Sequence, residues 1–581
     1  MSKRRKTWYA DFETTQPNEL GEVRCYLWVL TFENGRSVYN YDIESFINYI
    51  KDKTAIIYFH NLKFDSSYFM YYFIKHNIKF KVCEKSGVIY NIKFKNIEFR
   101  DSLNILPYTL KQIGETFCTR FHKLDYDDYA KPFDYVPNKY DITYCKWDTL
   151  TLKEGLENYL TELQKVLEEN GATKTAKKIF SKLTNAGIAY EAFKEITHIE
   201  KYCERTTREL YNYLKPAYSG GYVYAKGGCY QEDDSTKIIM LDENSMYPDK
   251  YANWEMPIGK SFSLVDGDEN RSDIFGIINI TFTFLELKEG YLPIISQGFN
   301  KYGSTIYIDH IDSPYSITTT IHEFQMIKKF YKFDYYFNYG FGWNKKIHLF
   351  KKYADIFMSI KANSTGVRRE VAKKLLNMCY GKTAMSGVSE IKEYYLNEEG
   401  VVCSRITGYE NDDNELQYLQ IAIAICSYAH IDLWNNMQKV GCENVLYTDT
   451  DSIKFLMHDE AILNELDLDD YRLGAWKVEG HPQIFKPLAP KKYIYLEDDR
   501  IHVTSAGFNH KEVFEALKCP IDEELFNKKG IVASMPLKID EAMKYIDKFD
   551  FGLQVKSKQS KLVEGGRLIS EIIKEIKEPR K

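Results

Sequence analysis

Three aspartates of this sequence could together hold divalent cations. Asp449 and Asp451 stand one residue apart in "NVLYTDTDSIKFL", an otherwise apolar segment in which like charges repel each other and resist burial. A cation such as Mg²⁺ would offset this repulsion, because it prefers carboxylate oxygens together with substrate phosphates. Asp242 follows the apolar run "KIIML" and would stand at a strand end. If Asp242 faces the tip of a hairpin between "NVLYT" and "SIKFL", the three acids predict a metal site.

A second group of acids lies near the start of the sequence. "DFETT" supplies Asp11 and Glu13, "YFHNLKFD" supplies Asp65, and "YCKWD" supplies Tyr144 and Asp148. Residues two apart on a strand share a face, as do residues four apart on a helix, so four acids can converge. Two cations held about 3.5–4 Å apart by such acids can activate a water and stabilise the leaving oxygen of a phosphodiester. Each acid alone is typical of a helix surface, turn or cap, but the combination predicts an exonuclease site.

The segment "GVRREVAKKLLNMCYGK" predicts a helix with two different faces. One face would pack, through Val371, Leu375 and Met378. The opposite face has cations suited to phosphates, an amide, and a ring suited to stacking on a base or sugar, namely Arg369, Lys373, Asn377 and Tyr380. It therefore indicates a nucleoside triphosphate surface, and an ordinary amphipathic surface helix is the alternative.

The acids need strands and helices that bring them together. From 8 to about 110, short apolar runs alternate with turns, which predicts strands of a mixed sheet. From Asp141, the expected N-cap, to about Asn170, apolar residues recur at helical spacing, so a long helix should close this first unit. The portion from about 253 to 346 has strand-like runs without paired acids and is typical of an insertion. The basic tail "KSKQSKLVEGGRLISEIIKEIKEPRK" predicts either a solvated amphipathic helix or a segment that contacts a nucleic-acid backbone.

Length and composition exclude several classes of protein. A chain of 581 residues is longer than a single hydrophobic core usually serves, so several domains are expected. The 11 cysteines form no CxxC pair, which argues against a disulfide framework or a zinc ribbon. No apolar run reaches the roughly 20 residues of a membrane span, and none follows the basic start "MSKRRK", so a cytosolic protein is expected. The net charge of -5 decides nothing about nucleic acid, because lysines can concentrate in one cleft.

The ordered motifs resemble a known family. "DFETT", "NLKFD" and "YCKWD", followed by "DENSMYP", "KKLLNMCYG", "YTDTDS" and "KKY", closely resemble the family B DNA polymerases. The resemblance is closest to the protein-primed branch, of the phage phi-29 kind, and covers essentially the whole chain. "YSGGY" at 218–222 is similar to the linker of that branch between exonuclease and polymerase. "RDSLNILP" is similar to its exonuclease stretch that holds single-stranded DNA and terminal protein.

The resemblance implies an α+β, multidomain fold. An RNase H-like 3′-5′ exonuclease domain would be followed by a palm, fingers and thumb polymerase domain with two terminal-protein-region insertions. The implied boundaries are 1–185 for the exonuclease domain, 186–253 for the N-terminal part of the palm, 254–350 for the first insertion, 351–384 for the fingers, 385–420 for the second insertion, which would serve strand displacement and processivity, 421–510 for the C-terminal part of the palm and 511–581 for the thumb.

The resemblance also implies roles for exonuclease residues. Metal would be bound by Asp11, Glu13, Asp65 and Asp148. Tyr144 would orient the water, and Lys123 in "HKLDYDDY" would assist catalysis. The frayed primer end would be held by Thr14, Asn61, Phe64, Ser102 and Leu103.

The resemblance also implies roles for residues of the polymerase domain. Asp242, Glu243 and Asp451 would bind the catalytic ions, two Mg²⁺ per active site with Mn²⁺ as an alternative, and Asp449 would support them. Tyr247 would lie under the incoming sugar and disfavour a 2′-hydroxyl, and the nucleotide would also contact Arg369, Lys373, Asn377 and Tyr380. DNA would be bound by Tyr218, Gly220, Gly221, Lys491 and Tyr493.

The implied activity is DNA-directed DNA polymerisation with 3′-5′ proofreading. Such an enzyme would replicate a linear phage genome by protein-primed, processive, strand-displacing synthesis in the cytoplasm of the infected bacterial host. Its partners would be primer-template and single-stranded DNA, dNTPs and a terminal protein that supplies the priming hydroxyl. A monomer without membrane association is expected.

Four positions depart from the family pattern. Cys426 and His430 in "CSYAH" replace a threonine and an arginine, and Glu243 and Met246 replace valine and leucine. The metal site tolerates glutamate at position 243 if this residue contributes mainly its backbone.

Two rival functions explain less of the sequence. A glycosyltransferase with a D-x-D metal site would leave the first acid group, the "KKLLNMCYG" helix and Lys491 unexplained. A non-enzymatic DNA-binding or scaffold protein would need no paired acids.

Overall fold

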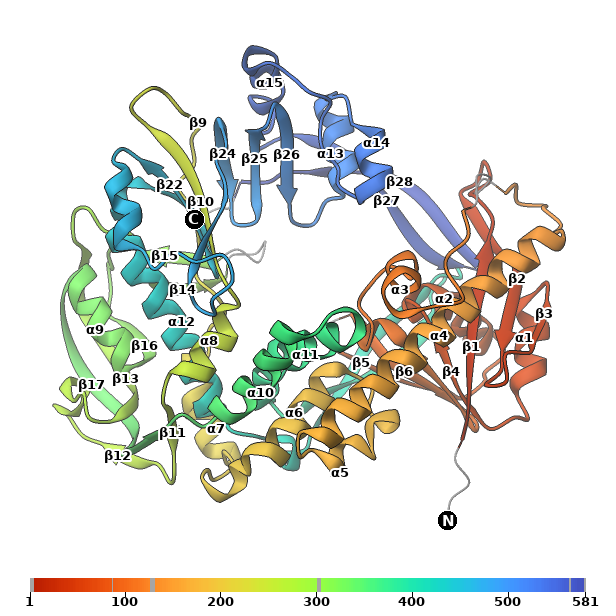
Figure 1. The fold of residues 1–581 in the computed structure, drawn as a ribbon, viewed down its shortest axis with the longest axis horizontal. Coiled ribbons are helices and arrows are strands. Elements are labelled where there is room, and N and C mark those ends of the chain that lie inside the picture. The colour runs from red at the N-terminus through yellow and green to blue at the C-terminus, as the bar shows by residue number, and fades with distance from the viewer. Residues whose placement is uncertain (1–4, 86, 126–130, 300–304, 564–565, 579–581) are drawn as a thin grey trace.

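The computed structural model describes residues 5–85, 87–125, 131–299, 305–563 and 566–578. Figure 1 shows the N-terminal elements on the right, the elements around β10 on the left, and the C-terminal elements across the top. The first four residues of the start "MSKRRK" and the last three of the basic tail lie outside the described residues. In the part of the chain that is described, no helix is both long and apolar enough to cross a membrane.

A nine-stranded sheet forms the N-terminal part, as the alternating apolar runs predict. Its order is β27-β28-β2-β1-β4-β7-β6-β5, with β3 paired to β2. β1 pairs parallel with β4 and antiparallel with β2, so the sheet is mixed. The strands and helices of this part are β1 Lys6–Thr14, β2 Glu22–Thr31, β3 Ser37–Asn40, α1 Ile43–Ile50, β4 Ala55–Phe59, α2 Leu62–Lys75, β5 Lys81–Lys85, β6 Val88–Phe94, β7 Ile97–Asp101, α3 Leu110–Phe117 and α4 Lys139–Glu169.

Aromatic side chains fix α2 against this sheet. Phe12 of β1, Phe59 of β4 and Phe99 of β7 pack with Phe69 of α2, and the rings of Phe69 and Phe99 are stacked at 4.6 Å. Full burial of such a ring contributes about 1.5–3 kcal/mol. Because Asp65 lies one turn before Phe69, this packing also sets the place of the Asp65 carboxylate.

A five-stranded sheet lies at the centre of the chain, in the order β23-β10-β22-β21-β8. α12 shares a buried apolar cluster with this sheet through Leu433 and Met437, and Asp242 of β10 lies opposite Ser452 of β22. Its elements and the helices that precede it are α5 Thr173–Ala176, α6 Asn185–Thr197, α7 Arg208–Leu214, β8 Val223–Ala225, β10 Lys237–Glu243, α8 Met246–Asn253, α12 Leu419–Lys439, β21 Val445–Asp449, β22 Ser452–Met457 and β23 Trp476–Gly480.

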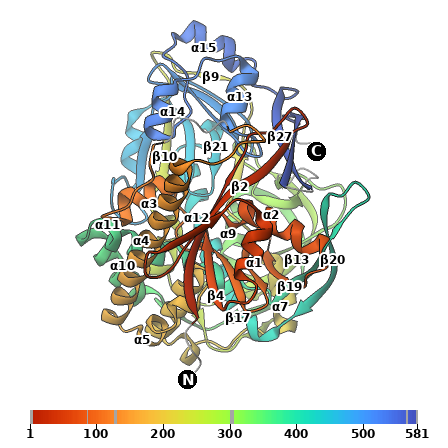
Figure 2. The ribbon, with the colours of Figure 1, turned by 90° about the vertical axis from the view of Figure 1, so that its right-hand side faces the viewer.

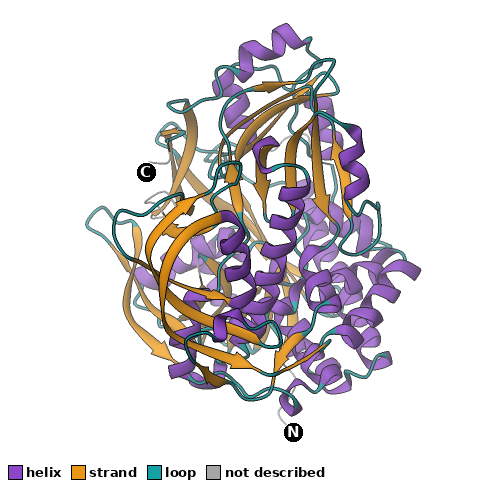
Figure 3. Cartoon of the chain, turned by 90° about the vertical axis from the view of Figure 1, so that its left-hand side faces the viewer, coloured by secondary structure: helices purple, strands orange, loops and turns teal. Residues whose placement is uncertain are grey.

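The predicted insertion contains a second antiparallel sheet, in the order β12-β17-β13-β16. Figure 3 shows strands on this side of the molecule curving around helices. Its elements, and the helices and hairpin that follow it, are β11 Met256–Ile258, β12 Phe262–Leu264, β13 Phe275–Leu287, β14 Ile295–Phe299, β15 Thr305–Ile308, β16 Tyr315–Thr320, α9 Ile321–Phe330, β17 Tyr331–Trp343, β18 Lys345–Ile347, α10 Lys351–Asn363, α11 Gly366–Met378, β19 Val388–Leu396 and β20 Val402–Asn411.

The C-terminal part consists of a small sheet, three helices and a long hairpin. The sheet order is β26-β25-β24-β9. The elements are β9 Tyr230–Gln231, β24 Ile484–Ala489, β25 Lys492–Glu497, β26 Arg500–Ser505, α13 His510–Leu517, α14 Glu523–Lys529, α15 Ile539–Ile546, β27 Gln554–Val563 and β28 Gly566–Glu575.

The last strand joins the first sheet. β28 pairs antiparallel with β2, with Glu22 opposite Leu568, and the Ile569 N–H donates to the Gly21 carbonyl at 2.6 Å. Figure 2 shows β27 beside the upper end of β2. Main-chain hydrogen bonds therefore join the segment 21–24 to the segment 566–569.

Two local predictions are wrong. The N-cap of α4 is Asn138, whereas Asp141 is its capping-box partner and accepts from the Asn138 N–H at 2.7 Å. The tail is a β-hairpin and not a helix, because residues of β27 alternate between buried, as Val555 and Ser557, and exposed, as Lys556. Pairing with β2 overrides the local helical pattern.

Replacing Gly21 by alanine should loosen the C-terminal hairpin. Gly21 has φ +82°, and a Cβ there would lie 2.1 Å from the Ile569 carbonyl oxygen. In Gly21→Ala we expect amide hydrogens of β28 to exchange faster with solvent, while those of β4 keep their protection. Gly35→Ala is the matched control. Gly35 has φ +79° with no described atom within 4 Å of the Cβ position, so it adds only the backbone strain of about 1–2 kcal/mol. Equal exchange of β28 in the two variants would contradict this.

Candidate active sites

The central sheet brings Asp242 beside the "DTD" turn. β21 ends at Asp449 and β22 begins at Ser452, so the two aspartates lie at the tip of the predicted hairpin. Thr450 between them has φ +64°, which tightens the turn. The Glu243 N–H donates to the Asp451 carbonyl at 2.7 Å, next to Asp242. Asp242 and Asp451 are therefore neighbours across the pair of strands.

These acids repel each other. Burial, followed by the charges of Asp451 and Glu479, raises the pKa of Asp242 to about 7. Burial also raises the pKa of Asp451. A carboxylate pair of this kind is stabilised by a cation between or beside its oxygens, so these acids fit divalent metal.

Asp449 has a different environment. Its carboxylate accepts from Lys491 Nζ at 2.9 and 3.1 Å and from Thr450 Oγ1 at 3.2 Å. Tyr493 lies on β25 with its ring 4.9 Å from that of Tyr447. Lys491 thus contacts the acid group directly, and Tyr493 packs on Tyr447, two residues before Asp449.

Sequence reasoning missed a buried lysine at this site. Lys454 lies on the same face of the sheet as Asp242, and its Nζ donates to Ser452 Oγ at 3.2 Å. The ammonium also lies 5.0 Å from the Tyr447 ring and 5.3 Å from the Tyr493 ring. Burial lowers the pKa of Lys454, and the neighbouring acids oppose this. A lysine inside the apolar run "SIKFL" was the available signal.

The metal-binding role predicted for Glu243 fits only its main chain, as expected from the sequence. Its carboxylate lies on the opposite face of β10, 2.6 Å from Lys250 Nζ. Burial raises the pKa of Glu243 to about 8, and Lys250 opposes this. Only the main chain of Glu243 lies beside Asp242, because successive side chains of a strand point to opposite faces.

The predicted nucleotide helix has the two expected faces. On α11, Val371 and Leu375 are buried, while the exposed side chains are those of Arg369, Lys373 and Asn377. Tyr380 lies beyond the helix, in a 3₁₀ turn at Tyr380–Ala384, and its ring is stacked on that of Tyr247 at 4.6 Å. This stack joins α8, which follows Asp242, to the end of α11.

The "YSGGY" linker packs against the "DTD" turn. The Thr450 N–H donates to the Tyr222 carbonyl at 2.8 Å, and a Cβ on Gly221 would lie 2.2 Å from Thr450 Oγ1. Glycine is therefore required there by the close approach of the turn. His430, one of the departures, contacts the Gly220 carbonyl through Nε2 at 2.7 Å and Glu323 through Nδ1 at 2.8 Å.

One further linker residue and one residue of α12 belong to this region. Tyr218 lies under the ammonium of Lys215, which is 4.3 Å from the ring. Cys426, the other departure on α12, is buried.

The second acid group converges in the N-terminal part. Asp11 and Glu13 lie on β1, Asp65 on α2 and Asp148 on α4. Burial and then the charge of Asp148 raise the pKa of Asp11 to about 7. Burial likewise raises the pKa values of Glu13 and Asp65. Asp65 Oδ1 and Asp148 Oδ1 are buried without a hydrogen-bond partner among the described residues, so this group also fits divalent cations.

Lys123 reaches this group from the loop before α4. Its Nζ is 2.5 Å from Asp148 Oδ2 and 4.7 Å from the Tyr144 ring. The lysine therefore lies beside the two residues of the "YCKWD" motif.

Sequence reasoning missed Cys145 at this site. Its Sγ is 3.9 Å from Asp11 Oδ2, and the ligand atoms of Asp11, Glu13 and Cys145 lie within 4.8 Å of one another. Its place depends on how α4 lies against β1, which no local pattern encodes.

The residues predicted to hold single-stranded DNA share hydrogen-bond partners. Asp101 Oδ1 accepts from the N–H groups of Asn61, at 3.1 Å, and Leu103, at 2.9 Å. Ser102 Oγ is 2.9 Å from His60 Nδ1. Asp101 and His60, which sequence reasoning missed, thus fix this stretch at the carboxyl ends of β7 and β4.

A cavity of about 420 Å³ adjoins this stretch. Asn61 and Phe64 line it together with residues of the β19–β20 hairpin and of β27 and β28. The Arg567 guanidinium lies 4.8 Å from the Phe64 ring. Thr14 is the last residue of β1 and follows Glu13 directly.

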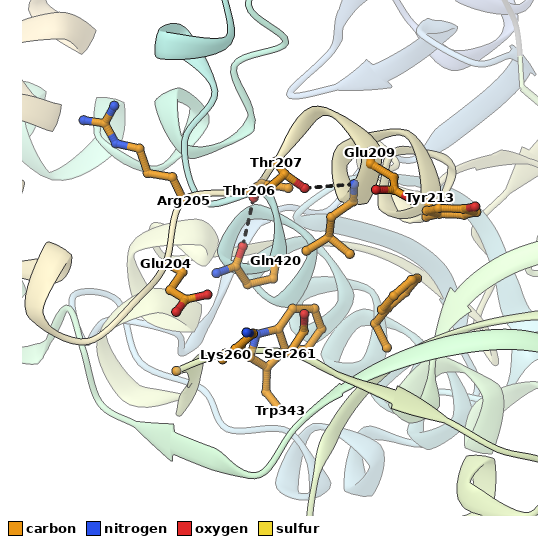
Figure 4. Close-up of a pocket in the computed structure, with 13 residues that line it drawn as sticks. Glu204, Arg205, Thr206, Thr207, Glu209, Tyr213, Lys260, Ser261, Trp343 and Gln420 are labelled. Carbon is orange, nitrogen blue, oxygen red and sulfur yellow. Dashed lines mark hydrogen bonds between the residues drawn. The ribbon is translucent and has the colours of Figure 1, made fainter.

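Another cavity, of about 290 Å³, lies away from both acid groups (Figure 4). In Figure 4 Thr206 and Gln420 point toward each other, and Thr206 Oγ1 donates to Gln420 Oε1 at 3.2 Å. Thr207 Oγ1 accepts from the Leu210 N–H at 3.2 Å as the N-cap of α7. Thr207 therefore caps α7, and Thr206 contacts Gln420 near the start of α12.

The raised pKa of Asp242 predicts a pH-dependent stability of the metal-free protein. Since the folded-state pKa of about 7 exceeds the model-compound value of 3.8, the folded state binds the extra proton between these pH values. Stability should therefore fall as pH rises from about 4 to about 7. We expect Asp242→Asn to raise the Tm in EDTA at pH 8 and to change it little at pH 4.

The control is Asp459→Asn, at an exposed N-cap position where asparagine serves equally well. Mg²⁺ should stabilise the wild type more than Asp242→Asn, because the cation offsets the repulsion. Identical Tm values of wild type and Asp242→Asn at pH 8 would rule out the interpretation.

Comparison with known proteins agrees with this arrangement. The family DNA polymerase type B, organellar and viral, matches residues 47–132 and 126–456. The DNA polymerase of Streptococcus phage Cp-1 is 27% identical over 613 residues, covering 98% of each chain, and that of Bacillus phage Nf is 25% identical over 524 residues, covering 84% of this chain and 87% of the relative.

The fold is also that of a solved polymerase, and the expected α+β, multidomain architecture is confirmed. The phi29 DNA polymerase complexed with primer-template DNA and incoming nucleotide substrates superposes with a TM-score of 0.79 at 22% identity, over 99% of this chain and 100% of that one. The family match spans well over half of the sequence and includes Asp65, Asp148, Asp242, Asp449 and Asp451. This chain belongs to the type B DNA polymerases of organelles and viruses.

Proposed function

We propose that this protein is a DNA-directed DNA polymerase in which a primer 3′-hydroxyl attacks the α-phosphate of a dNTP. The observation that carries the proposal is the pairing of β10 with β22, which makes Asp242 and Asp451 neighbours. Two Mg²⁺ ions, with Mn²⁺ as an alternative, would lower the pKa of the attacking hydroxyl and stabilise the charge developing on the phosphate. The DNA and nucleotides bound to the phi29 DNA polymerase support these substrates.

The exposed face of α11 would bind the triphosphate. Lys373 and Arg369 would neutralise the phosphates, and Asn377 would add an amide contact. Tyr247, stacked on Tyr380, would lie under the incoming sugar and disfavour a 2′-hydroxyl.

The primer would be held on the side of the acid group that faces away from α11. Lys491, already paired with Asp449, and Tyr493 would steady its terminus. The linker from Tyr218 through Gly220 and Gly221 would contact DNA beside the "DTD" turn.

We also propose a 3′-5′ proofreading exonuclease at the N-terminal acid group. Asp11, Glu13, Asp65 and Asp148 would hold the metal, and Tyr144 would orient the attacking water. Lys123 would assist from its contact with Asp148. The frayed primer end would reach the acids along Thr14, Asn61, Phe64, Ser102 and Leu103.

Substitutions in one acid group should abolish one activity and leave the other intact. Asp242→Ala or Asp451→Ala should lower primer extension by a factor on the order of 10³ or more, because each removes an electrostatic group that acts in the transition state. Degradation of single-stranded DNA by the same variants should remain near the wild-type rate. Both rates are measured on labelled primer-template and single strands with Mg²⁺.

The mirror variants complete the test. Asp11→Ala and Asp65→Ala should abolish degradation and leave extension intact, and Asp459→Ala, at an exposed cap, should change neither rate. Near wild-type extension by Asp242→Ala would disprove the polymerase assignment.

The resemblance to the protein-primed branch supports a more specific proposal. The segments 254–350 and 385–420 would be the two terminal-protein regions, with 1–185 as exonuclease, 186–253 and 421–510 as palm, 351–384 as fingers and 511–581 as thumb. The enzyme would act as a monomer in the infected bacterial cytoplasm, and processive strand displacement would follow from enclosure of the DNA by these parts. The β19–β20 hairpin reaches the N-terminal sheet, where Lys392 Nζ is 3.0 Å from Glu84.

Protein priming can be tested without a DNA primer. With template, dNTPs and the purified terminal protein of the same phage, a labelled nucleotide should become covalently attached to that protein, because its hydroxyl replaces the primer 3′-hydroxyl. The product is detected on a denaturing gel. Asp451→Ala should give no product, and incorporation that requires an added DNA primer even with terminal protein present would refute this mode.

A further inference from the structure

A buried lysine lies behind Asp242 at the end of β10. The Lys250 side chain is 1% exposed, and its Nζ contacts Glu243 at 2.6 Å, Asp249 at 3.0 Å and Asp432. An ammonium removed from water is stable only when it is paired and hydrogen-bonded, which these carboxylates achieve. Because the acids come from β10, α8 and α12, the lysine joins three elements.

Glu243 connects this ammonium to the acids on the other face of the strand. It follows Asp242 directly, and its N–H donates to the Asp451 carbonyl at 2.7 Å. Its main chain therefore touches both acids, while its side chain is held by Lys250. A movement of the Glu243 side chain would shift Asp242 relative to Asp451.

The carboxylate of Glu243 depends on Lys250 for its counter-charge. Glu243 is 1% exposed, and its Oε2 is buried without a hydrogen-bond partner among the described residues. Without the ammonium, this carboxylate would have to move toward water or be protonated. Either change alters the end of β10.

The same lysine also fixes elements on the nucleotide side. Lys250 lies one turn after Tyr247 on α8, and the Tyr247 ring is stacked on that of Tyr380. Asp249 is packed so closely against Gly474, just before β23, that a Cβ there would lie 2.4 Å from its carboxylate carbon. The surroundings of Lys250 thus leave little freedom for α8 or for the neighbouring strand.

We propose that Lys250 is a positioning residue of the polymerase site, whose ammonium fixes the Glu243 main chain and thereby the separation of the Asp242 and Asp451 carboxylates. It would act through these acids and not on the substrate itself. The inference rests on the proposed polymerase function and adds a residue that none of the catalytic motifs singles out.

Lys250→Met in the full-length protein tests the proposal, because methionine keeps the apolar stem and removes the ammonium. We expect the Mg²⁺ concentration for half-maximal primer extension to rise about tenfold, the scale on which residues that orient metal ligands act. Mn²⁺ titration followed by electron paramagnetic resonance should show a similar weakening at the polymerase site. The Mg²⁺ dependence of single-strand degradation should stay unchanged, which also shows that the protein is folded.

Two further variants separate positioning from general stability. Glu243→Leu/Lys250→Met replaces the ammonium and its most buried carboxylate by apolar side chains, which is often tolerated, while Asp249 and Asp432 keep hydrogen bonds from Asn253 and Asn436. The Mg²⁺ requirement of this variant should therefore return to within about threefold of the wild type. Lys237→Met is the matched control. Lys237 lies at the other end of β10 and pairs with Glu460 at 2.7 Å, but its side chain is 56% exposed, so its loss should leave both curves unchanged.

Three results would overturn the proposal. They are a wild-type Mg²⁺ dependence of extension in Lys250→Met, a parallel loss of extension and degradation, or a double variant as impaired as the single one. If the wild type itself extended no primer, the proposed function would fail, whereas the Mn²⁺ titration would still decide whether Lys250 positions the acids.

Discussion

The repulsion between Asp242 and Asp451 is the constraint on which the central part of the molecule depends. Strand pairing forces the two carboxylates together, partly out of water, so their charges cannot both be relieved by solvent. The surrounding sheet, the buried aromatic rings and the Lys250 contacts must therefore resist a force that would separate the strands. The same condition recurs at Asp11 and Asp148 in the N-terminal part. Both regions crowd carboxylates whose mutual repulsion a cation would reduce, so cation binding and folding stability are linked.

Much of this arrangement could be predicted because it is local. The alternation of apolar residues gave the strands, and the position of Asp242 after "KIIML" was enough to place it at a strand end. Likewise, helical spacing was enough to separate the packed face of α11 from its exposed cations. These inferences required only the periods of strands and helices and the order of the motifs.

The remaining features depend on contacts between distant segments. Lys454 stands out in its apolar strand, but its contact with Tyr493 depends on a distant strand. In the same way, the contact of Glu243 with Lys250 depends on how α8 packs beside β10. The C-terminal tail has a helical pattern of its own, and its strand conformation comes from pairing within the hairpin and with β2. No local rule specifies such partners, because their free energy comes from tertiary packing.

The pairing of β28 with β2 has a consequence for biosynthesis. A ribosome releases β1 to β7 long before it completes β28. During that time β3 covers only part of the outer edge of β2, and the stretch 22–24 has no strand beside it. An uncovered strand edge can pair with another nascent chain, and domains generally fold in the order in which they are made. The N-terminal unit must therefore avoid such pairing until β28 has been made, and translation products truncated before β28 would expose that edge permanently.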